Sequence, residues 1–260
     1  MRRFWDSSAR LAGQLAAPRL LVTLDFDGTL AALAQTPGAA RLRPEYRTAL
    51  IRLAAAPGVS VFILSGRTLG DVKALVGLPR LYYGGNHGIE VAGPGFSCRD
   101  PRAEKTREMV ASAAADMLQR FPPGTGVLVE DKVFSASVHY RTLKPAYRAG
   151  FFGRMRTLTA RQGGRLRWRR GHKVFELRPV SACDKGAAAL RLRMELGNPF
   201  AVAVGDDLTD EDMFRALKGR GITVRVGMKR GSKAEYFLDR QTEVLRLLKF
   251  ILAARKARGI

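Results

Sequence analysis

The chain has 260 residues, of which 46% are hydrophobic and 26% charged, a balance typical of a folded globular protein and not of a disordered one. Its first residues lack the apolar run of a secretory signal and no segment approaches the ~18 apolar residues that span a bilayer, so we expect a cytoplasmic protein with no membrane partner. The formal net charge of +22, from 45 basic and 23 acidic residues, favours anionic partners without choosing among them.

The first third of the chain alternates buried apolar strands with helices, a pattern typical of a parallel α/β sheet. It predicts a central strand at 19–26, a helix at 44–55, strands at 59–64 and 81–84, and a short helix at 70–76. The last third resumes the alternation, with helices beginning at 184 and 210, strands at 201–204 and 222–226, and a closing amphipathic helix at 242–257. Both ends of the chain are therefore expected to share one sheet.

The middle of the chain follows a different pattern. It predicts a helix, adjacent strands at 127–130 and 133–141, a second helix, and a hairpin of strands 166–170 and 173–177 that turns at Gly171 and His172. Consecutive hairpins beside helices indicate an antiparallel α+β domain. The predicted organisation is a parallel-sheet α/β core formed by residues 1–101 and 181–260, interrupted by an α+β cap at 102–180.

Two carboxylates, Asp25 and Asp27, follow the first predicted strand in the segment DFDGT. In open α/β sheets, ligands bind at this end of the strands. Side chains two residues apart in an extended chain point to the same side, so both carboxylates can address one reacting group. The alternative is a polar Asp-Gly turn that carries no chemistry.

A second acidic cluster, GDDLTDED at 205–212, follows the predicted strand 201–204. Acids at the start of a helix stabilise its N-terminus, which accounts for those from Asp210 onward. It does not account for Asp206 and Asp207, which would repel each other and Asp25 unless a cation bridges them. Oxygen ligands without a Cys/His cluster favour Mg²⁺ over Zn²⁺.

Two weaker signals complete the set of candidate residues. Ser65, Gly66 and Arg67 follow the strand 59–64, where a hydroxyl and loop amides can hold phosphate oxygens, although this tripeptide alone is a common turn. Asp184 is suited to cap the next helix, and Lys185 is solvated by default but holds carboxylates and a phosphate together if it lies beside them. The order of these four signals, each at a strand end or helix start, favours a single site.

The positive charge is unevenly placed, because residues 141–178 contain twelve Lys/Arg and the single acid Glu176. This segment either forms a solvated basic face or attracts phosphorylated ligands by long-range electrostatics. A basic nucleic-acid-binding protein is a more distant alternative. We expect no nucleic-acid partner, because aromatic residues are not interleaved with the basic ones and the one cluster suited to chemistry is acidic. The oligomeric state is left open.

The chain resembles the haloacid dehalogenase superfamily of aspartate-dependent phosphatases, and more narrowly the trehalose-6-phosphate phosphatases. The superfamily's four motifs are matched by DFDGT at 25–29, Ser65, Lys185 and GDD at 205–207. Narrower matches are SGR at 65–67, GNHGIE at 85–90, EDK at 130–132, HYR at 139–141, KVFELRP at 173–179 and GDDLTDEDMF at 205–214. The resemblance extends over about 21–248 and implies a Rossmann-like core with an inserted α+β cap.

The resemblance also implies a mechanism. Asp25 is expected to be the nucleophile and Asp27 the acid and base, with Ser65 and Lys185 as further catalytic residues that bind the phosphate oxygens. It implies Mg²⁺ as cofactor, held by the Asp25 carboxylate, the Asp27 main-chain oxygen and Asp206. Asp207 and Asp210 are expected to orient these metal ligands.

The expected substrate is a small sugar phosphate, trehalose 6-phosphate. Another glycosyl phosphate is the first alternative, because related cap-bearing phosphatases share the motifs, and a phosphotransferase or mutase that uses Asp25 in the same way is a second. The residues expected to bind substrate are Ser65, Gly66, Arg67, His87, Glu130, Lys132, Arg141, Lys173 and Glu176. For any one residue in the predicted cap, the alternative is that it faces solvent.

Overall fold

The computed structural model describes residues 1–160, 164–171, 173–180, 183–257 and 259, and the chain divides into two compact units. Unit 1 comprises Met1–Ala34, Gly38–Cys98 and Asp184–Ile260, and unit 2 comprises Gln35–Pro37 and Arg99–Cys183. Among the described residues, none of the helices combines the length and apolar character needed to cross a membrane.

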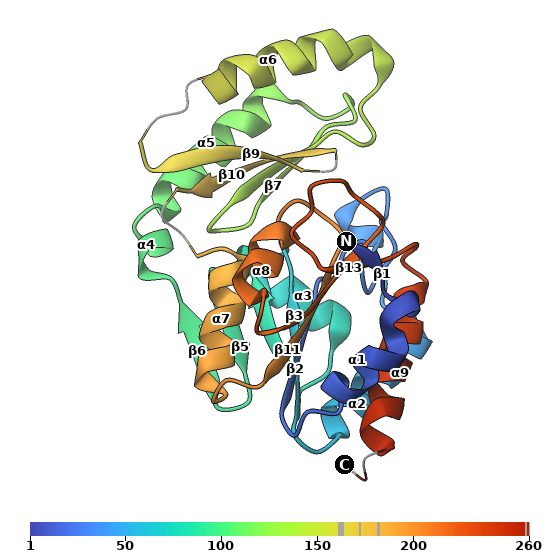
Figure 1. Ribbon diagram of the computed structural model, residues 1–260. Helices are drawn as coiled ribbons and strands as arrows, with labels where there is room; N and C mark the ends of the chain where they lie inside the picture. The colour runs from blue at the N-terminus through green and yellow to red at the C-terminus, as the bar shows by residue number, and fades with distance from the viewer. Residues whose placement is uncertain (161–163, 172, 181–182, 258, 260) are drawn as a thin grey trace. The chain divides into compact units, whose positions relative to one another are not determined.

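Unit 1 is built on a nine-stranded sheet (Figure 1). In spatial order its strands are β1 (Arg2–Arg3), β13 (Tyr236–Leu238), β12 (Gly221–Val226), β11 (Phe200–Gly205), β2 (Leu20–Leu24), β3 (Val59–Leu64), β4 (Tyr82–Gly85), β5 (Glu90–Gly93) and β6 (Phe96–Arg99). All neighbours from β1 to β4 are parallel, and β5 runs antiparallel to β4. The predicted α/β class, with a mainly parallel sheet shared by both ends of the chain, is confirmed.

Helices lie on both faces of this sheet (Figure 1). One face packs on α1 (Ser8–Leu15), α2 (Pro44–Ala55) and α9 (Glu243–Lys256), while α7 (Lys185–Glu195) and α8 (Asp210–Leu217) lie on the other. The alternation of β2 explains the layering, because Leu20, Val22 and Leu24 enter the core shared with α2 and α9 while Leu21 and Thr23 point away from it. The helix α3 (Leu69–Val76) joins β3 to β4.

The order of the strands determines where the sheet can bind a ligand, at the carboxyl ends of its central strands. From β2 the chain moves outward to β3 and β4 on one side, and it later returns to β11 and β12 on the other. The carboxyl ends of β3, β2 and β11 therefore lie side by side where the direction of winding reverses. This switch point is the position at which open α/β sheets bind their ligands.

Most of the predicted core elements form within a residue or two of the expected bounds. The helix at Pro44–Ala55 and the strand at Val59–Leu64 coincide with the prediction. The sequence pattern missed α1. It also missed the strands β1, β5, β6 and β13, because segments of two to four residues contain too few positions to show a strand period. Short 3₁₀ turns lie at Trp5–Ser7, Pro37–Ala39, Asn86–Gly88 and Pro145–Tyr147.

A buried arginine fastens the last helix of unit 1 to earlier parts of the chain. Arg255 in α9 is 1% exposed, and its guanidinium donates to the carbonyl oxygens of Ala17 at 2.7 Å and of Pro57. Burial lowers the pKa of this guanidinium. Because the two carbonyls follow α1 and α2, Arg255 holds three segments in register at the end of the sheet opposite the carboxyl ends of the strands.

Unit 2 is an antiparallel α+β structure, as the sequence predicts. Its sheet has the order β7 (Leu128–Asp131), β8 (Ala136–His139), β10 (Val174–Pro179) and β9 (Leu166–Gly171). The helices α5 (Arg107–Arg120) and α6 (Arg148–Ala160) pack on one face, and α4 (Pro101–Glu104) precedes them. The predicted hairpin turn at His172 lies outside the described residues.

Alternation in this sheet separates an apolar face from a polar one. Val138 and Leu177 pack with the helices. Glu130, Ser137 and Glu176 are register partners on β7, β8 and β10 and point to the opposite face. The polar face is therefore the part of unit 2 that can bind a hydroxyl-rich or charged ligand.

Candidate active site

The open edge of the unit 1 sheet gathers residues from three strand ends. Asp25 follows β2, Ser65 follows β3 and Asp206 follows β11. The strands are in register, with Leu24 between Ile63 and Val204, and the Asp25 N–H donates to the Val204 carbonyl at 2.9 Å. The acids that follow separate strands in the sequence therefore lie beside one another at the same end of the sheet.

Lys185 is the cation at the centre of this edge. Asp184 caps α7 by accepting from the Ala187 N–H at 2.9 Å, as predicted, which fixes the start of the helix. Lys185 Nζ then lies 2.6 Å from Asp25 Oδ1 and 2.7 Å from Asp210 Oδ1. The three side chains are 2%, 7% and 0% exposed, so these charges interact with little screening by water.

Asp210 fixes the loop that follows β11. While its Oδ1 binds Lys185, its Oδ2 accepts from the N–H groups of Asp206 at 2.8 Å and Asp207 at 2.9 Å. These contacts are made within the protein interior, where the Asp210 side chain is fully buried. Asp210 therefore couples the position of Lys185 to the position of the acidic loop.

Three carboxylates converge at this edge in a way that suits a cation. Ligand oxygens of Asp25, Asp206 and Asp210 all lie within 4.8 Å of one another. Thr29 Oγ1 also donates to Asp206 Oδ1 at 3.3 Å. A donor set made of oxygen alone fits a hard divalent cation such as Mg²⁺ rather than a metal that prefers nitrogen or sulfur.

The pKa shifts of these groups indicate an excess of negative charge. Burial raises the pKa of Asp25 well above its usual range; the charge of Lys185 opposes the shift, and those of Asp210 and Asp206 reinforce it. Burial, together with the charges of Asp210 and Asp207, raises the pKa of Asp206 to about 7. Burial lowers the pKa of Lys185, but the charges of Asp210 and Asp25 outweigh it and the net shift is upward. One ammonium group does not balance the cluster, so the residues present fit a further cation.

Glycines make the room in which this cluster assembles. A Cβ atom on Gly205 would lie 2.3 Å from Asp210 Cγ, and one on Gly186 would lie 2.4 Å from the main-chain oxygen of Asp212. Gly28 has φ +90°, and a Cβ there would lie 2.2 Å from Asp206 Oδ2. Gly186 lets the start of α7 press against α8, which brings Lys185 to Asp210.

Arg225 is a positioning residue that the sequence analysis missed. It lies in β12, is buried, and donates from Nη1 to the Asp207 carbonyl at 3.1 Å and to Glu211 Oε1 at 2.9 Å; its Nη2 donates to the Asp206 carbonyl. Arg225 therefore fixes the backbone of the acidic loop through the carbonyl groups of Asp206 and Asp207. A single charged residue in an otherwise apolar buried strand was the signal that could have identified it.

The loops after β3 and β4 form one connected wall. The His87 N–H donates to the Ser65 carbonyl at 2.9 Å and the Asn86 N–H to the Arg67 carbonyl at 2.6 Å. His87 is 6% exposed and has φ +59°, and a Cβ on Gly66 would lie 2.4 Å from its ring. The structure thus brings Ser65, Gly66 and His87 together, with the histidine ring seated on the glycine.

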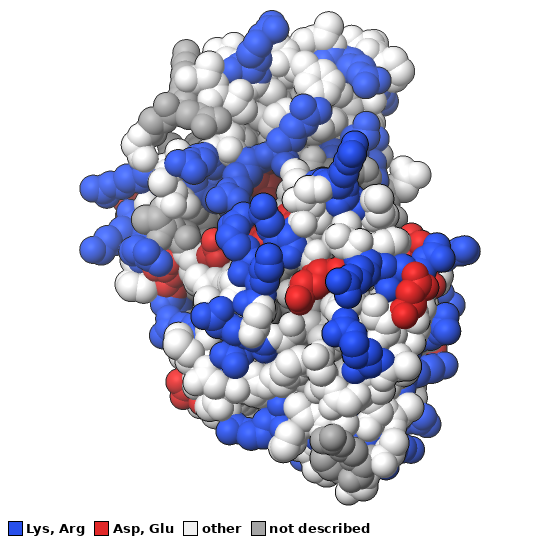
Figure 2. Space-filling model, viewed as in Figure 1, with Lys and Arg blue, Asp and Glu red and all other residues white. Residues whose placement is uncertain are grey.

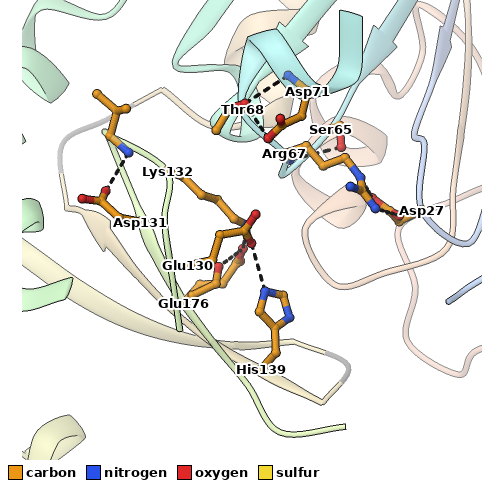
Figure 3. Close-up of polar contacts among 12 residues, drawn as sticks. Asp27, Ser65, Arg67, Thr68, Asp71, Glu130, Asp131, Lys132, His139 and Glu176 are labelled. Carbon is orange, nitrogen blue, oxygen red and sulfur yellow. Dashed lines mark hydrogen bonds and ion pairs between the residues drawn. The ribbon is translucent and has the colours of Figure 1, made fainter. Parts of the chain in front are cut away.

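Arg67 reaches the second carboxylate of the DFDGT segment. Its Nε donates to Asp27 Oδ2 and its Nη2 to Asp27 Oδ1, each at 2.7 Å, and the guanidinium faces the carboxylate (Figure 3). Asp27 does not belong to the group of converging carboxylates at Asp25, and its side chain is oriented by this ion pair instead. Both residues are expected in the site from the sequence, but no sequence pattern predicts their contact.

Unit 2 carries a separate polar cluster on the helix-free face of its sheet (Figure 3). Lys132 Nζ lies 3.6 Å from Glu130 Oε2 and 3.5 Å from Glu176 Oε1, and His139 Nε2 lies 3.0 Å from Glu130 Oε2. Lys132 and Glu176 are 5% and 7% exposed. Three of the predicted sugar-binding residues are therefore neighbours.

The two other predicted residues of unit 2 lie elsewhere in the fold. Lys173 is exposed and has φ +63°, and its ammonium lies 5.9 Å from the centroid of the Tyr140 ring. Arg141 follows β8 and is half-buried. Exposed arginines lie in the edge strand β9 at 167, 169 and 170 and just before it at 165. On the face shown in Figure 2, Lys and Arg side chains far outnumber Asp and Glu.

Known proteins match this chain along most of its length. The trehalose-phosphatase family model matches residues 23–242. The trehalose-phosphate phosphatase of Mycobacterium tuberculosis is 37% identical over 222 residues, which cover 83% of this chain and 56% of that protein. The probable trehalose-phosphate phosphatase 3 of Oryza sativa is 32% identical over 268 residues, which cover 94% of this chain and 72% of that protein. The chain spans about half the length of the mycobacterial relatives.

A solved structure has the same fold. The C-terminal domain of Candida albicans trehalose-6-phosphate phosphatase superposes with a TM-score of 0.79 at 24% identity, over 95% of this chain and 96% of that domain. This agreement confirms the predicted fold, a Rossmann-like core interrupted by an α+β insert.

The contact at Gly186 predicts an unusual effect on stability. In an ordinary helix, Gly→Ala stabilises by up to about 1 kcal/mol, but in Gly186→Ala the Cβ meets the Asp212 main-chain oxygen at 2.4 Å. We expect Gly186→Ala to lower the free energy of unfolding by about 1–3 kcal/mol. The matched control is Gly153→Ala in α6, where nothing lies within 4 Å and stability should rise. Urea denaturation measures both, and a Gly186→Ala protein at least as stable as the wild type contradicts the packing described.

The pKa of Asp206 predicts how stability depends on pH without divalent cations. A group whose pKa rises from 3.8 unfolded to about 7 folded binds more protons in the folded state between these values, so stability falls as pH rises through that window. In EDTA, the wild type should lose melting temperature from pH 4 to pH 7 relative to Asp206→Asn. At pH 8 the variant should be the more stable protein. Parallel melting curves for the two proteins would contradict this assignment.

Proposed function

Because the chain belongs to the trehalose-phosphatase family, we propose that it is a phosphatase that hydrolyses trehalose 6-phosphate to trehalose and phosphate. The observation that carries the proposal is the buried contact of Lys185 with Asp25 at a sheet edge that also holds Asp206 and Ser65. The names of the relatives support trehalose 6-phosphate as the substrate, and the residues at the sheet edge support hydrolysis of a phosphate ester.

In the first step, an oxygen of Asp25 attacks the phosphorus atom and the bond from phosphorus to the sugar oxygen breaks. Protonated Asp27 gives its proton to that sugar oxygen, so the sugar leaves as a neutral alcohol. The product on the protein is an aspartyl-phosphate at Asp25. Lys185 and Ser65 bind the phosphate oxygens, where negative charge is concentrated in the transition state.

In the second step, water attacks the phosphorus of the aspartyl-phosphate. Asp27, now ionised, takes a proton from the water, and the bond from phosphorus to Asp25 breaks. This releases inorganic phosphate and returns both carboxyl groups to their starting forms. One residue serves as acid and then as base, because each step leaves it in the form that the next step needs.

We further propose that Mg²⁺ is the cofactor, held by the carboxylates of Asp25 and Asp206 and the main-chain oxygen of Asp27. Held by these residues, the ion would supply positive charge to offset that of the phosphate. The raised pKa of Asp25 supports this need, because a protonated carboxyl group is no nucleophile and Lys185 alone does not offset the burial. Asp207 and Asp210 would orient the acidic loop, as the contacts of Asp210 with its amides suggest.

Unit 2 is proposed to act as a cap that recognises the sugar. Glu130, Lys132 and Glu176 offer acceptors and donors at close range on the helix-free face of the sheet, which suits adjacent sugar hydroxyls. Arg141 and Lys173 remain proposed contacts to the sugar or its phosphate. Ser65, Gly66 and His87 are proposed to contact the substrate from unit 1, whereas the guanidinium of Arg67, expected among these residues, contacts Asp27.

The proposal names a small-molecule partner and no nucleic acid, and it keeps the predicted cytoplasmic location and the domain bounds 1–101, 102–180 and 181–260. Another glycosyl phosphate is the alternative substrate, because a pair of acids and a lysine fit the hydroxyl groups of many sugars. A panel of sugar phosphates separates these possibilities.

The nucleophile is tested by phosphate release in Mg²⁺ from trehalose 6-phosphate and a panel of other sugar phosphates. We expect the highest kcat/KM for trehalose 6-phosphate, and we expect Asp25→Asn to lose activity by about 10³-fold or more. Asp116→Asn is the control, because this aspartate lies on an exposed surface of α5. EDTA should abolish activity and Mg²⁺ should restore it. Activity of Asp25→Asn equal to the wild type would exclude Asp25 as the nucleophile.

The role of unit 2 is tested by Glu176→Gln, which keeps the shape of the side chain and removes its charge. We expect KM for trehalose 6-phosphate to rise about tenfold or more, because hydrogen bonds to a charged group are lost. Activity toward p-nitrophenyl phosphate, which carries no sugar, should change less than about threefold on the same reasoning. Glu108→Gln on the exposed side of α5 is the control. Equal losses on both substrates would mean that Glu176 does not read the sugar.

A further inference from the structure

We propose that Arg67 positions the acid and base Asp27, and that it does not serve as a ligand of the substrate phosphate. This inference rests on the proposed function, since it assigns Asp27 to proton transfer. It starts from the two parallel hydrogen bonds of 2.7 Å that join the guanidinium of Arg67 to both oxygens of the Asp27 carboxylate.

The geometry of this pair fixes a direction as well as a position. A guanidinium presents its N–H groups in a rigid plane, and two parallel bonds hold a carboxylate in that plane. A single point charge such as an ammonium group would leave the carboxylate free to rotate. The Asp27 side chain is 33% exposed, so without this contact it could turn toward water.

Arg67 is itself anchored by the loop that is proposed to bind phosphate. Its N–H donates to Ser65 Oγ at 3.2 Å, and its carbonyl accepts from the Asn86 N–H at 2.6 Å. Its guanidinium carbon lies 5.5 Å from the centroid of the Phe26 ring, next to Asp27 in the chain. The arginine side chain is 11% exposed. Arg67 thus connects the loops after β3 and β2, so that the position of the loop after β3 determines the position of the Asp27 carboxylate.

The pair is compatible with both protonation states that the reaction needs. A carboxylate has about four lone-pair sites, and the two N–H bonds of Arg67 occupy two of them. A proton can therefore sit on the outer side of an Asp27 oxygen without displacing the arginine. When Asp27 gives this proton to the sugar oxygen or takes one from water, Arg67 keeps the carboxyl group aimed, and its own protons stay in place.

This assignment makes a prediction that depends on the leaving group. A sugar alkoxide needs a proton to leave, so activity on trehalose 6-phosphate requires a correctly aimed acid. The p-nitrophenolate of p-nitrophenyl phosphate leaves without one. Asp27 also serves as base in the second step, which is the same for both substrates, so the first step is measured alone, in a single turnover. We expect Arg67→Ala to slow the release of trehalose from trehalose 6-phosphate by about 10–10²-fold and the release of p-nitrophenolate from p-nitrophenyl phosphate by less than about threefold. Inhibition by orthovanadate, a probe of the phosphate site, should be unchanged.

Three controls separate a positioning role from a loss of structure. Arg67→Lys keeps the charge but makes no paired contact, and it should behave like Arg67→Ala; full rescue by lysine would overturn the geometric argument. Asp27→Asn should show the same dependence on the leaving group, and adding Arg67→Ala to Asp27→Asn should cause no further loss. Thermal melting of each variant identifies any that fail to fold, and Arg99→Ala serves as a surface control from outside unit 1.

The outcomes distinguish this inference from the proposed function. If Arg67→Ala weakens orthovanadate inhibition and slows the first step on both substrates alike, Arg67 binds phosphate and the inference is wrong. Additive losses in the double variant would overturn it as well. If the wild type releases no phosphate from any sugar phosphate, the proposed function fails instead. If the wild type is active but Asp27→Asn shows no dependence on the leaving group, the assignment of Asp27 fails and the inference fails with it.

Discussion

The arrangement of acids at the core sheet depends on one buried ammonium group. Lys185 Nζ lies 2.6 Å from Asp25 and 2.7 Å from Asp210. All three side chains are buried, so water screens their charges little. Without that cation, carboxylates at the ends of neighbouring buried strands would repel one another at low dielectric. Through Asp210 the same cation fixes the loop after β11. The alignment of α7, β2 and that loop is therefore an electrostatic requirement as much as a packing one.

Each acidic segment of the edge is matched by a cation from a different element. Lys185 from α7 binds Asp25, Arg67 from the loop after β3 binds Asp27, and Arg225 from β12 holds the backbone of the acidic loop. Even so, burial raises the pKa of Asp25 well above its usual range and that of Asp206 to about 7. A divalent ion would meet the charge that the side chains leave unbalanced. This excess of negative charge is the feature of the edge that suits the proposed cation.

The sequence allowed the core strands, the family and the residues at the strand ends to be predicted, because apolar periodicity and short motifs are local signals. It did not reveal that Arg67 pairs with Asp27, since the two are separated by 40 positions and their contact depends on side-chain direction. It also missed Arg225, which lies in a strand that pattern alone marks as structural. The function of Gly186 depends on how closely two helices approach, and no residue pattern reports that distance. In unit 2, strand register brings Glu130 and Glu176 together, and Lys132 joins them from the position just after β7.

The two-part construction of unit 1 has a consequence for synthesis on the ribosome. Residues 1–98 contain β2, but its neighbour β11, the partner Lys185 and the Arg255 clamp belong to segments made after unit 2. At ~5–20 residues per second, one hydrogen-bonding edge of the apolar strand β2 stays unpaired for on the order of ten seconds before its partner strand is made. Unit 2 is almost entirely one continuous segment and can pair its own strands in that interval. The nascent core is thus the vulnerable half, and a chaperone that shields an open strand edge would be needed most during those seconds.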